Sequence, residues 1–380
     1  MPGYAVRKTV ILCKDDFAYL SHPSIVILDS GEWLAAFNHS RRREPALHPP
    51  TDPLFRSLLT RSWDEGASWE APGFAPDFDW SGTECPGIAQ LSEGTVVLTQ
   101  FRFGWYPLGL ARKRREAGEP ISLCLPDKYW TEDFGEDDWE RSLFTWARGY
   151  HGLYAHLSSD RGHSFDYTVK LDTDSYRDGY SRTPVVELAD GRVAYAVTEH
   201  HPPANRFTYI LFSEDKCRSW QAPVPILDDP DRVFAEPDIA EVGTDELYCV
   251  LRSDARVYLH GCRSLDGGRS WSAPEPTPMD GHPGHLLVLR DGRLQPRLDA
   301  DAFQPSLVET PGHLHVVDAH RPADHVEADA TDLQLHADVL PLELEAVDLH
   351  LQLRALQPEG EPYGPADDEG LGRGTARHVA

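Results

Sequence analysis

The sequence predicts an all-β fold, a six-bladed β-propeller, and two repeated signatures carry this prediction. An eight-residue turn of the form Ser-x-Asp-x-Gly-x-Ser-Trp occurs at 62–69 and 264–271, with degraded copies at 158–165 and 213–220. Six apolar runs each begin with a residue that precedes a proline, at Pro23, Pro86, Pro184, Pro237, Pro283 and Pro305. Two independent signatures that recur in one phase, at a spacing near fifty residues, indicate propeller blades rather than a β-sandwich with chance turns, and six starts imply six blades.

Each residue type in the repeated turn has a structural role. The aspartate turns the chain by bonding its own backbone, the glycine takes a positive φ angle, and the aromatic residue packs the turn onto the sheet. In the degraded copies Phe165 replaces the tryptophan and Cys217 replaces the glycine. We expect these residues to be structural and to lie at the outer edge of the sheets.

The proline-led runs predict the remaining strands of each blade. A short glycine-containing turn such as Asp-Ser-Gly-Glu, at 29–32, follows each run, and a second β-rich segment comes next, which is the pattern of a hairpin. The segment Val6–Leu12 is expected to pair with the last blade and close the ring. The propeller is therefore predicted to occupy residues 1–327.

The pattern is irregular in two places. An insertion at about 105–148 interrupts blade two and is either a lid or rim element or a solvated excursion. The fifth and sixth starts lie close together, so the last blades are expected to be irregular. Residues 328–380 contain no Trp, Phe or Lys. They form an atypical tail, for which unrecognised strands and disorder both remain open.

The charge and cysteine content exclude several classes of partner. A formal net charge of −26 disfavours nucleic acid and anionic membrane surfaces as partners, because both require a basic face. No apolar run is long enough for a signal peptide or a membrane span. The six cysteines form no Cys-x-x-Cys pair, so we expect reduced thiols and a cytoplasmic location. No cofactor and no metal are expected.

Propeller geometry selects candidate site residues. The first strand of each blade lines the central axis, and its entry end forms a funnel with the loop that follows the second strand. Strand starts and second-strand ends supply His22, Glu84, Cys85, Arg182, Glu236, His282, Arg41, Arg102, His200 and Arg252. Arginines clamp a carboxylate while carboxylates and imidazoles move protons, so this set suits an acidic sugar.

The repeated turn is the Asp-box, and residues 5–320 resemble the sialidase superfamily of six-bladed propellers. The run that begins A-E-P-D-I-A-E-V and ends V-L-R-S matches a family segment, which makes Glu236 and Arg252 the similar carboxylate and arginine. In the L-S-H-P-S run, His22 stands where the family has its first arginine. Asp52 occupies a place similar to that of the family's acid/base aspartate. The resemblance implies a sialidase-like protein rather than a standard sialidase.

The expected function is a glycoside hydrolase, exo-α-sialidase-like, that acts on an acidic or polar glycan end. Glu236, Asp52 and His22 form the predicted catalytic set. The predicted substrate-binding residues are Arg252, Arg182, Arg41, Arg102, His200 and His282. Two alternatives remain open: a polysaccharide lyase on uronic-acid sugars with His22 or His200 as the base, and a propeller that binds carbohydrate without catalysis. A metal site formed by His22, Glu199 and His200 is a further hypothesis, but the spacing of these residues does not by itself indicate one.

Overall fold

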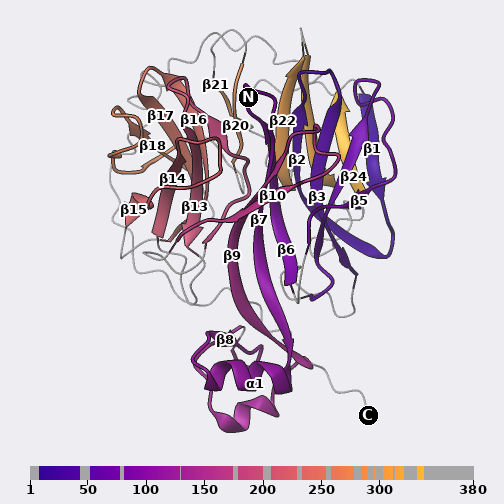
Figure 1. Ribbon diagram of the computed structural model, residues 1–380, viewed down its shortest axis with the longest axis vertical. Helices are drawn as coiled ribbons and strands as arrows, with labels where there is room; N and C mark the ends of the chain where they lie inside the picture. Colours follow the sequence, from indigo (N-terminus) through magenta and orange to yellow (C-terminus); the bar gives the residue numbers. More distant parts are fainter. Residues whose placement is uncertain are drawn as a thin grey trace. The chain divides into compact units, whose positions relative to one another are not determined.

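The chain folds as an all-β protein with a propeller arrangement of sheets (Figure 1). Its coordinates are a computed structural model. They describe residues 8–42, 52–77, 81–128, 130–173, 179–199, 207–228, 233–253, 258–277, 284–289, 294–296, 303–310, 313–320 and 332–337.

Blades one and two are built from consecutive antiparallel strands, as the hairpin signature predicts. Blade one runs in the order β2 (Ala18–Ile27), β3 (Trp33–Arg41), β4 (Arg56–Ser62) and β5 (Gly73–Phe74). Blade two runs in the order β6 (Ser81–Gln90), β7 (Val96–Pro107), β9 (Trp146–Ser158) and β10 (Tyr167–Lys170), and the short β8 (Ile121–Ser122) also pairs with β9.

Blades three and four repeat this order of strands. In blade three, two short inner strands pair with the second strand, so that the elements are β11 (Gly179–Tyr180), β12 (Val186–Glu187), β13 (Val193–Glu199), β14 (Phe207–Ser213) and β15 (Val224–Asp228). Blade four consists of β16 (Phe234–Gly243), β17 (Glu246–Ser253), β18 (His260–Ser264) and β19 (Glu275–Pro276).

Two further sheets follow blade four among the described residues, and the irregularity of the last blades stays a prediction. A two-stranded sheet joins β20 (Leu286–Val288) and β21 (Leu294–Pro296). A four-stranded sheet contains β22 (Phe303–Thr310), β23 (His313–His320), β24 (Asp332–Ala337) and β1 (Lys8–Lys14). Because the fifth sheet has two strands among the described residues, the prediction of six complete blades stays a prediction.

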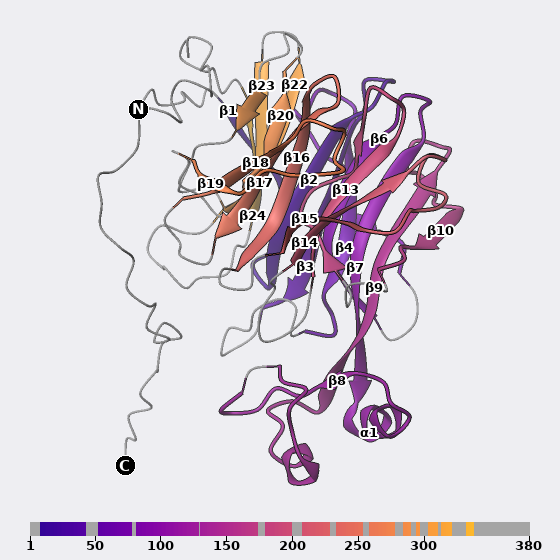
Figure 2. The same cartoon turned by 90° about the vertical axis from the view of Figure 1, so that its left-hand side faces the viewer.

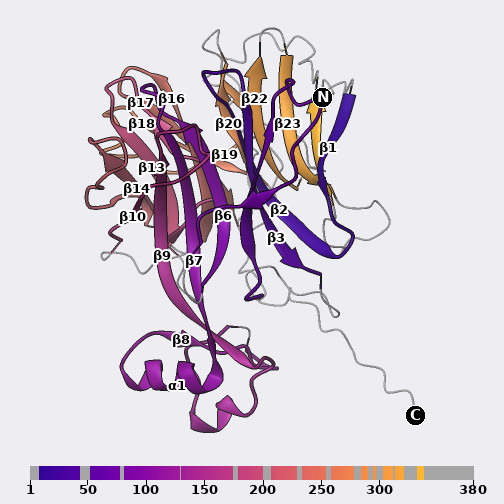
Figure 3. The same ribbon diagram turned by 45° about the vertical axis from the view of Figure 1, so that its right-hand side comes forward.

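The amino-terminal strand pairs with the last sheet, as expected for Val6–Leu12. β1 runs antiparallel to β24, with Lys8 opposite Ala337 and Lys14 opposite Asp332. Figure 3 shows β1 at the edge of the sheet that contains β22 and β23. β24 lies beyond the predicted propeller boundary at residue 327, so this sheet extends at least to Ala337.

The hydrophobic core is divided into layers between neighbouring blades. One layer packs Leu34 and Phe165 between blades one and two, and another packs Ile210 and Ile239 between blades three and four. Contacts between neighbouring sheets run from β2 to β6, from β7 and β9 to β11, from β13 to β16, from β16 to β20, from β20 to β22, and from β22 back to β2. Each sheet is therefore covered on both faces by its neighbours, which brings the inner strands to one axis.

All four predicted Asp-boxes have the same hydrogen-bond pattern. In the first box the Ser68 hydroxyl donates to Asp64 Oδ2 at 2.6 Å and the Gly66 amide donates to Ser62 Oγ at 2.8 Å. In the third box the Cys217 amide makes the same bond to Ser213 Oγ at 2.8 Å, with φ of 67°. Cysteine thus adopts the left-handed conformation that the other boxes assign to glycine, and the turn survives the substitution.

The insertion of blade two is an ordered subdomain (Figure 2). It contains the helix α1 (Leu108–Glu116), β8 and the 3₁₀ helix η2 (Glu136–Trp139), all at the end of the long β7–β9 pair. Its small core includes Tyr106, Phe134 and Trp139, and the Arg115 guanidinium lies 3.5 Å from the Phe134 ring centroid. Within the parts of the chain described, no helix is long and apolar enough to cross a membrane.

Candidate functional site

The inner strands of blades one, two and four share one backbone irregularity. A β-bulge interrupts each strand at its X-Pro pair, and the residue before the proline has a positive φ: 51° for His22, 52° for Cys85 and 53° for Glu236. Positive φ is uncommon outside glycine, and a residue before proline ordinarily adopts an extended conformation. Such strained positions and bulges concentrate at functional sites, so these three residues mark one.

Polar side chains from the preceding blade hold two of these bulges. Asn38 Oδ1 in blade one accepts a hydrogen bond from the Cys85 amide at 2.8 Å, and its Nδ2 donates to the Thr83 carbonyl at 3.0 Å. Thr198 Oγ1 in blade three accepts a hydrogen bond from the Glu236 amide at 2.8 Å. Backbone amides released by the bulges are thereby satisfied, and the side chains of Cys85 and Glu236 are fixed in direction.

Glu236 lies between two arginines. Its Oε1 accepts a hydrogen bond from Arg182 Nε at 2.6 Å and another from Arg252 Nη1 at 2.9 Å. The Glu236 side chain is 1% exposed, whereas those of Arg182 and Arg252 are 11% and 23% exposed. The three predicted residues therefore form one cluster that joins blades three and four, with Arg252 as its most accessible group.

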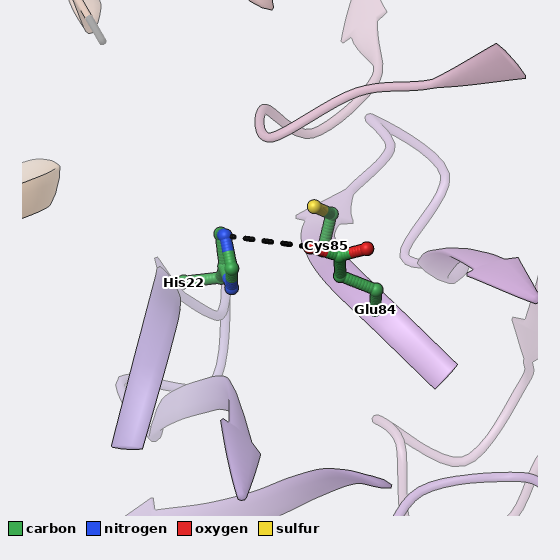
Figure 4. Close-up of side chains that lie close together, drawn as sticks. All are labelled: His22, Glu84 and Cys85. Atoms are coloured by element: carbon green, nitrogen blue, oxygen red, sulfur yellow. Dashed lines mark ion pairs between the residues drawn. The ribbon is translucent and has the colours of Figure 1, made fainter. Parts of the chain in front are cut away.

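A second group lies where blades one and two meet. His22 Nε2 is 3.9 Å from Glu84 Oε1, and Figure 4 shows the Cys85 side chain beside this pair. On its other side, His22 Nδ1 is 2.9 Å from the Ser21 hydroxyl oxygen. His22, Glu84 and Cys85 are all buried.

Electrostatic interactions connect the two groups. Burial raises the pKa of Glu84 to about 7, while Arg182 and Arg148 oppose the shift and Glu236 adds to it. Burial also raises the pKa of the Cys85 thiol, with Glu84 as the next contributor. For Arg182, burial acts against the charged form, but Glu236 and other neighbours raise its pKa overall. Both groups therefore belong to one site.

Two members of this site were not among the predicted residues. Tyr180 is buried, and its pKa is raised by burial and then by the charge of Glu236. It lies two positions before Arg182, and this proximity in the sequence was the signal available. Arg148 is 4% exposed, and its guanidinium lies 5.3 Å from the centroids of the Phe103 and Trp130 rings. No local pattern distinguished Arg148, because it lies at the end of the insertion.

The other predicted residues have different surroundings. Asp52 is 1% exposed, and its Oδ1 accepts a hydrogen bond from the Leu54 amide at 2.9 Å. The nearby Phe55 ring packs edge-on against His22 with centroids 6.4 Å apart, which places the Asp52 loop beside the site. Arg41 is exposed at the end of β3. His200 and His282 lie outside the described residues.

Arg102 of β7 contacts residues of blade one. It is fully buried, donates from Nη2 to the Pro76 carbonyl at 2.9 Å, and lies 5.2 Å from the Tyr154 ring centroid. Asp77 Oδ1 is 3.6 Å from its Nη1. These contacts join blades one and two, and a role of Arg102 in substrate binding stays a prediction.

The combined site holds an excess of positive charge. Arg182, Arg252 and Arg148 bring three guanidinium groups, which face the carboxylates of Glu236 and Glu84. With a pKa of about 7, Glu84 is only partly ionised at neutral pH. A positive centre in a chain of net charge −26 favours an anionic ligand at this place.

Comparisons with known proteins agree with this architecture. The sequence model of the BNR repeat-like domain matches residues 138–295. A protein of unknown function from Dyadobacter fermentans has a similar structure, with a TM-score of 0.70 and 18% identity over 90% of this chain and 100% of that one. No protein of curated function matches the sequence.

Sialidases are also among the structural neighbours. The intramolecular trans-sialidase of Ruminococcus gnavus has a TM-score of 0.59 at 13% identity, over 87% of this chain and 98% of that one. The K499G mutant of NanB sialidase from Streptococcus pneumoniae has a TM-score of 0.59 at 11% identity, over 89% of this chain and 70% of that one. These neighbours show that the chain has a sialidase-like propeller fold, and the match to the BNR repeat-like domain agrees with the Asp-boxes found in the sequence.

Proposed function

We propose that this protein is a glycoside hydrolase that acts on an acidic glycan end in the central funnel of a six-bladed propeller. The observation that carries the proposal is the buried Glu236 carboxylate held by Arg182 and Arg252 within a positive centre. Arg252 is the more exposed of the two arginines and is the first to meet a ligand carboxylate. A sialidase-like fold supports a sugar as the ligand.

The proposed reaction proceeds in two steps with retention at the anomeric carbon. In the first step the Tyr180 oxygen forms a bond to the anomeric carbon and its proton passes to Glu236. The glycosidic C–O bond breaks as Asp52 donates a proton to the departing oxygen. In the second step Asp52 takes a proton from water, the water oxygen replaces the tyrosine oxygen, and Glu236 returns its proton to Tyr180. Burial of Tyr180 keeps the free phenol protonated, so the carboxylate must act as the base.

The geometry also supports a lyase as the second candidate. When a pair of arginines neutralises the carboxylate of a uronic acid, the C–H bond next to this carboxylate becomes easier to deprotonate. His22 is a buried imidazole beside Glu84 and would be the base. We place either activity in the cytoplasm, because the six cysteines are free thiols, which suits a reducing compartment.

The deciding experiment is a screen of the purified protein against aryl glycosides of acidic sugars and uronic-acid polysaccharides. Release of the aryl alcohol supports hydrolysis, and loss of this release in Glu236→Gln, assayed well below its unfolding temperature, supports the assigned role. An unsaturated product that absorbs in the ultraviolet selects the lyase. Ligand binding by calorimetry without any product would reject catalysis and leave a carbohydrate-binding propeller.

A further inference from the structure

Three side chains of types that can bind metals lie close together at the junction of blades one and two (Figure 4). His22 comes from β2, and Glu84 and Cys85 come from β6. One ligand atom from each residue lies within 4.8 Å of the others, and all three residues are buried. The hydrolysis proposed above uses neither Glu84 nor Cys85.

The backbone fixes the directions of these side chains before any ligand arrives. His22 and Cys85 both hold positive φ angles at bulges, and the Asn38 side chain clamps the Cys85 amide from the neighbouring blade. Because strain of this kind persists only where the surrounding structure enforces it, the convergence of the two residues is a built feature of the fold. A preformed set of ligands lowers the cost of ordering on binding.

The His22 imidazole has a protein partner on the side that faces away from the cluster. His22 Nδ1 lies 2.9 Å from Ser21 Oγ, and the opposite ring nitrogen, Nε2, is the one that faces Glu84. Histidines that bind metals through one nitrogen almost always bond the other nitrogen to the protein, which fixes the tautomer and the ring plane. When Nδ1 carries the proton and donates it to Ser21, the Nε2 lone pair points into the cluster.

We propose that His22 Nε2, a Glu84 carboxylate oxygen and Cys85 Sγ bind a divalent ion of the zinc class. Sulfur and imidazole ligands suit zinc, whereas calcium and magnesium require oxygen ligands. Tetrahedral zinc places its N, O and S ligands about 3.3–3.6 Å apart. The separation of 3.9 Å between His22 and Glu84 must therefore shorten by about 0.6 Å, and separations up to the 4.8 Å limit of the set by up to about 1.2–1.5 Å. Three protein ligands leave a fourth position for water or a sugar oxygen.

The charge balance is compatible with the nearby arginines. On binding, the Cys85 sulfur forms a bond to the metal and releases its proton to the buffer, and no electron is transferred. A divalent ion with one thiolate, one carboxylate and a neutral imidazole has no net charge. Arg182 and Arg148, which act on Glu84, therefore meet at most about one positive charge more than before.

The test is metal binding by the full chain in the absence of any sugar. After treatment with a chelator under reducing conditions, the protein is titrated with Zn²⁺ against a chromophoric competitor and, separately, with Co²⁺. We expect one ion per chain and a near-ultraviolet sulfur-to-cobalt charge-transfer band. Cys85→Ser should abolish the band, and His22→Gln and Glu84→Gln should each weaken Zn²⁺ binding about 10–100-fold.

The half-exposed Cys13 of β1 provides the matched control, since Cys13→Ser removes a thiol that lies outside the cluster and should leave both signals unchanged. Circular dichroism of each variant establishes that it is folded. If Cys85→Ser fails to fold, Glu84→Gln replaces it, because this change preserves shape and hydrogen bonding.

The proposal is overturned if the wild-type protein binds no stoichiometric Zn²⁺, or if the cobalt band persists without Cys85. Since no substrate is involved, failure of this site would leave the proposed hydrolysis untouched, and the reverse also holds.

Discussion

Replacement of Glu236 by glutamine should destabilise the protein measurably, because Arg182 and Arg252 lose the buried anion that they share. Oε1 accepts hydrogen bonds of 2.6 and 2.9 Å, and a bond to a charged group contributes about 1.5–3 kcal/mol. Glutamine keeps an acceptor of about half that strength, so the expected loss over the two bonds is about 1.5–3 kcal/mol. With about 2.1 cal/mol/K of unfolding entropy per residue, a chain of 380 residues should lose about 2–4 °C in melting temperature.

Differential scanning calorimetry on Glu236→Gln, at one scan rate and low salt, measures this shift. Glu246→Gln is the matched control, since its partner Arg263 lies 2.8 Å away but both side chains are 30% exposed. An exposed pair of this kind contributes about 0–1 kcal/mol, so this control should melt within about 1 °C of the wild type. Equal shifts in the two variants, or a larger one in the control, would refute the assignment of Glu236 as the centre of a buried charge cluster.

Three further changes test other parts of the structure. Tyr180→Phe should reduce kcat by at least about 100-fold in a steady-state assay on an active glycoside while the protein stays folded, and a loss of less than tenfold would remove Tyr180 from the reaction. Hydrogen bonds from Ser270 and Ser264 lower the pKa of Asp266 to about 2. The contribution of Asp266 to stability is therefore complete above its unfolded pKa of about 3.8 and is lost as the pH falls through its folded pKa. In urea unfolding, the free energy of unfolding of Asp266→Asn should fall less steeply with pH below about pH 4 than that of the wild type, and an equal slope would contradict this. Gly87→Ala should cost about 1–3 kcal/mol by thermal unfolding, because its Cβ would lie 2.6 Å from the Thr183 carbonyl oxygen of the next blade, whereas Gly73→Ala meets no atom within 4 Å and should be neutral.

Local patterns carried most of the fold prediction. The Asp-box is a turn whose hydrogen bonds all lie within eight residues, so its sequence specifies its geometry, and even the copy with Cys217 forms it. The proline-led runs likewise identified the inner strands, where Pro23, Pro86 and Pro237 lie at bulges. The pairing of Glu236 with Arg252 was likewise predictable, because both residues belong to one hairpin.

Contacts between blades could not be predicted from local patterns in the sequence. The alternation of side chains along β7 does not predict that Arg102 contacts Pro76 and Asp77 of blade one. A bulge beside Arg102 shifts the register of β7 against β9. Arg148 approaches Glu84 through the folded insertion, and the order of that segment depends on its own core.

The sequence by itself determined the repeat, the turns, the order of the strands in blades one to four, and the residues that precede the inner prolines. These features follow from short-range backbone chemistry, in which aspartate, glycine and proline restrict φ and supply nearby hydrogen bonds. Only the tertiary structure decided that His22, Glu84 and Cys85 would meet, and that Arg182 of blade three would share Glu236 with Arg252 of blade four. Those contacts join distant segments, and their geometry depends on the packing of whole sheets around the axis rather than on any local preference.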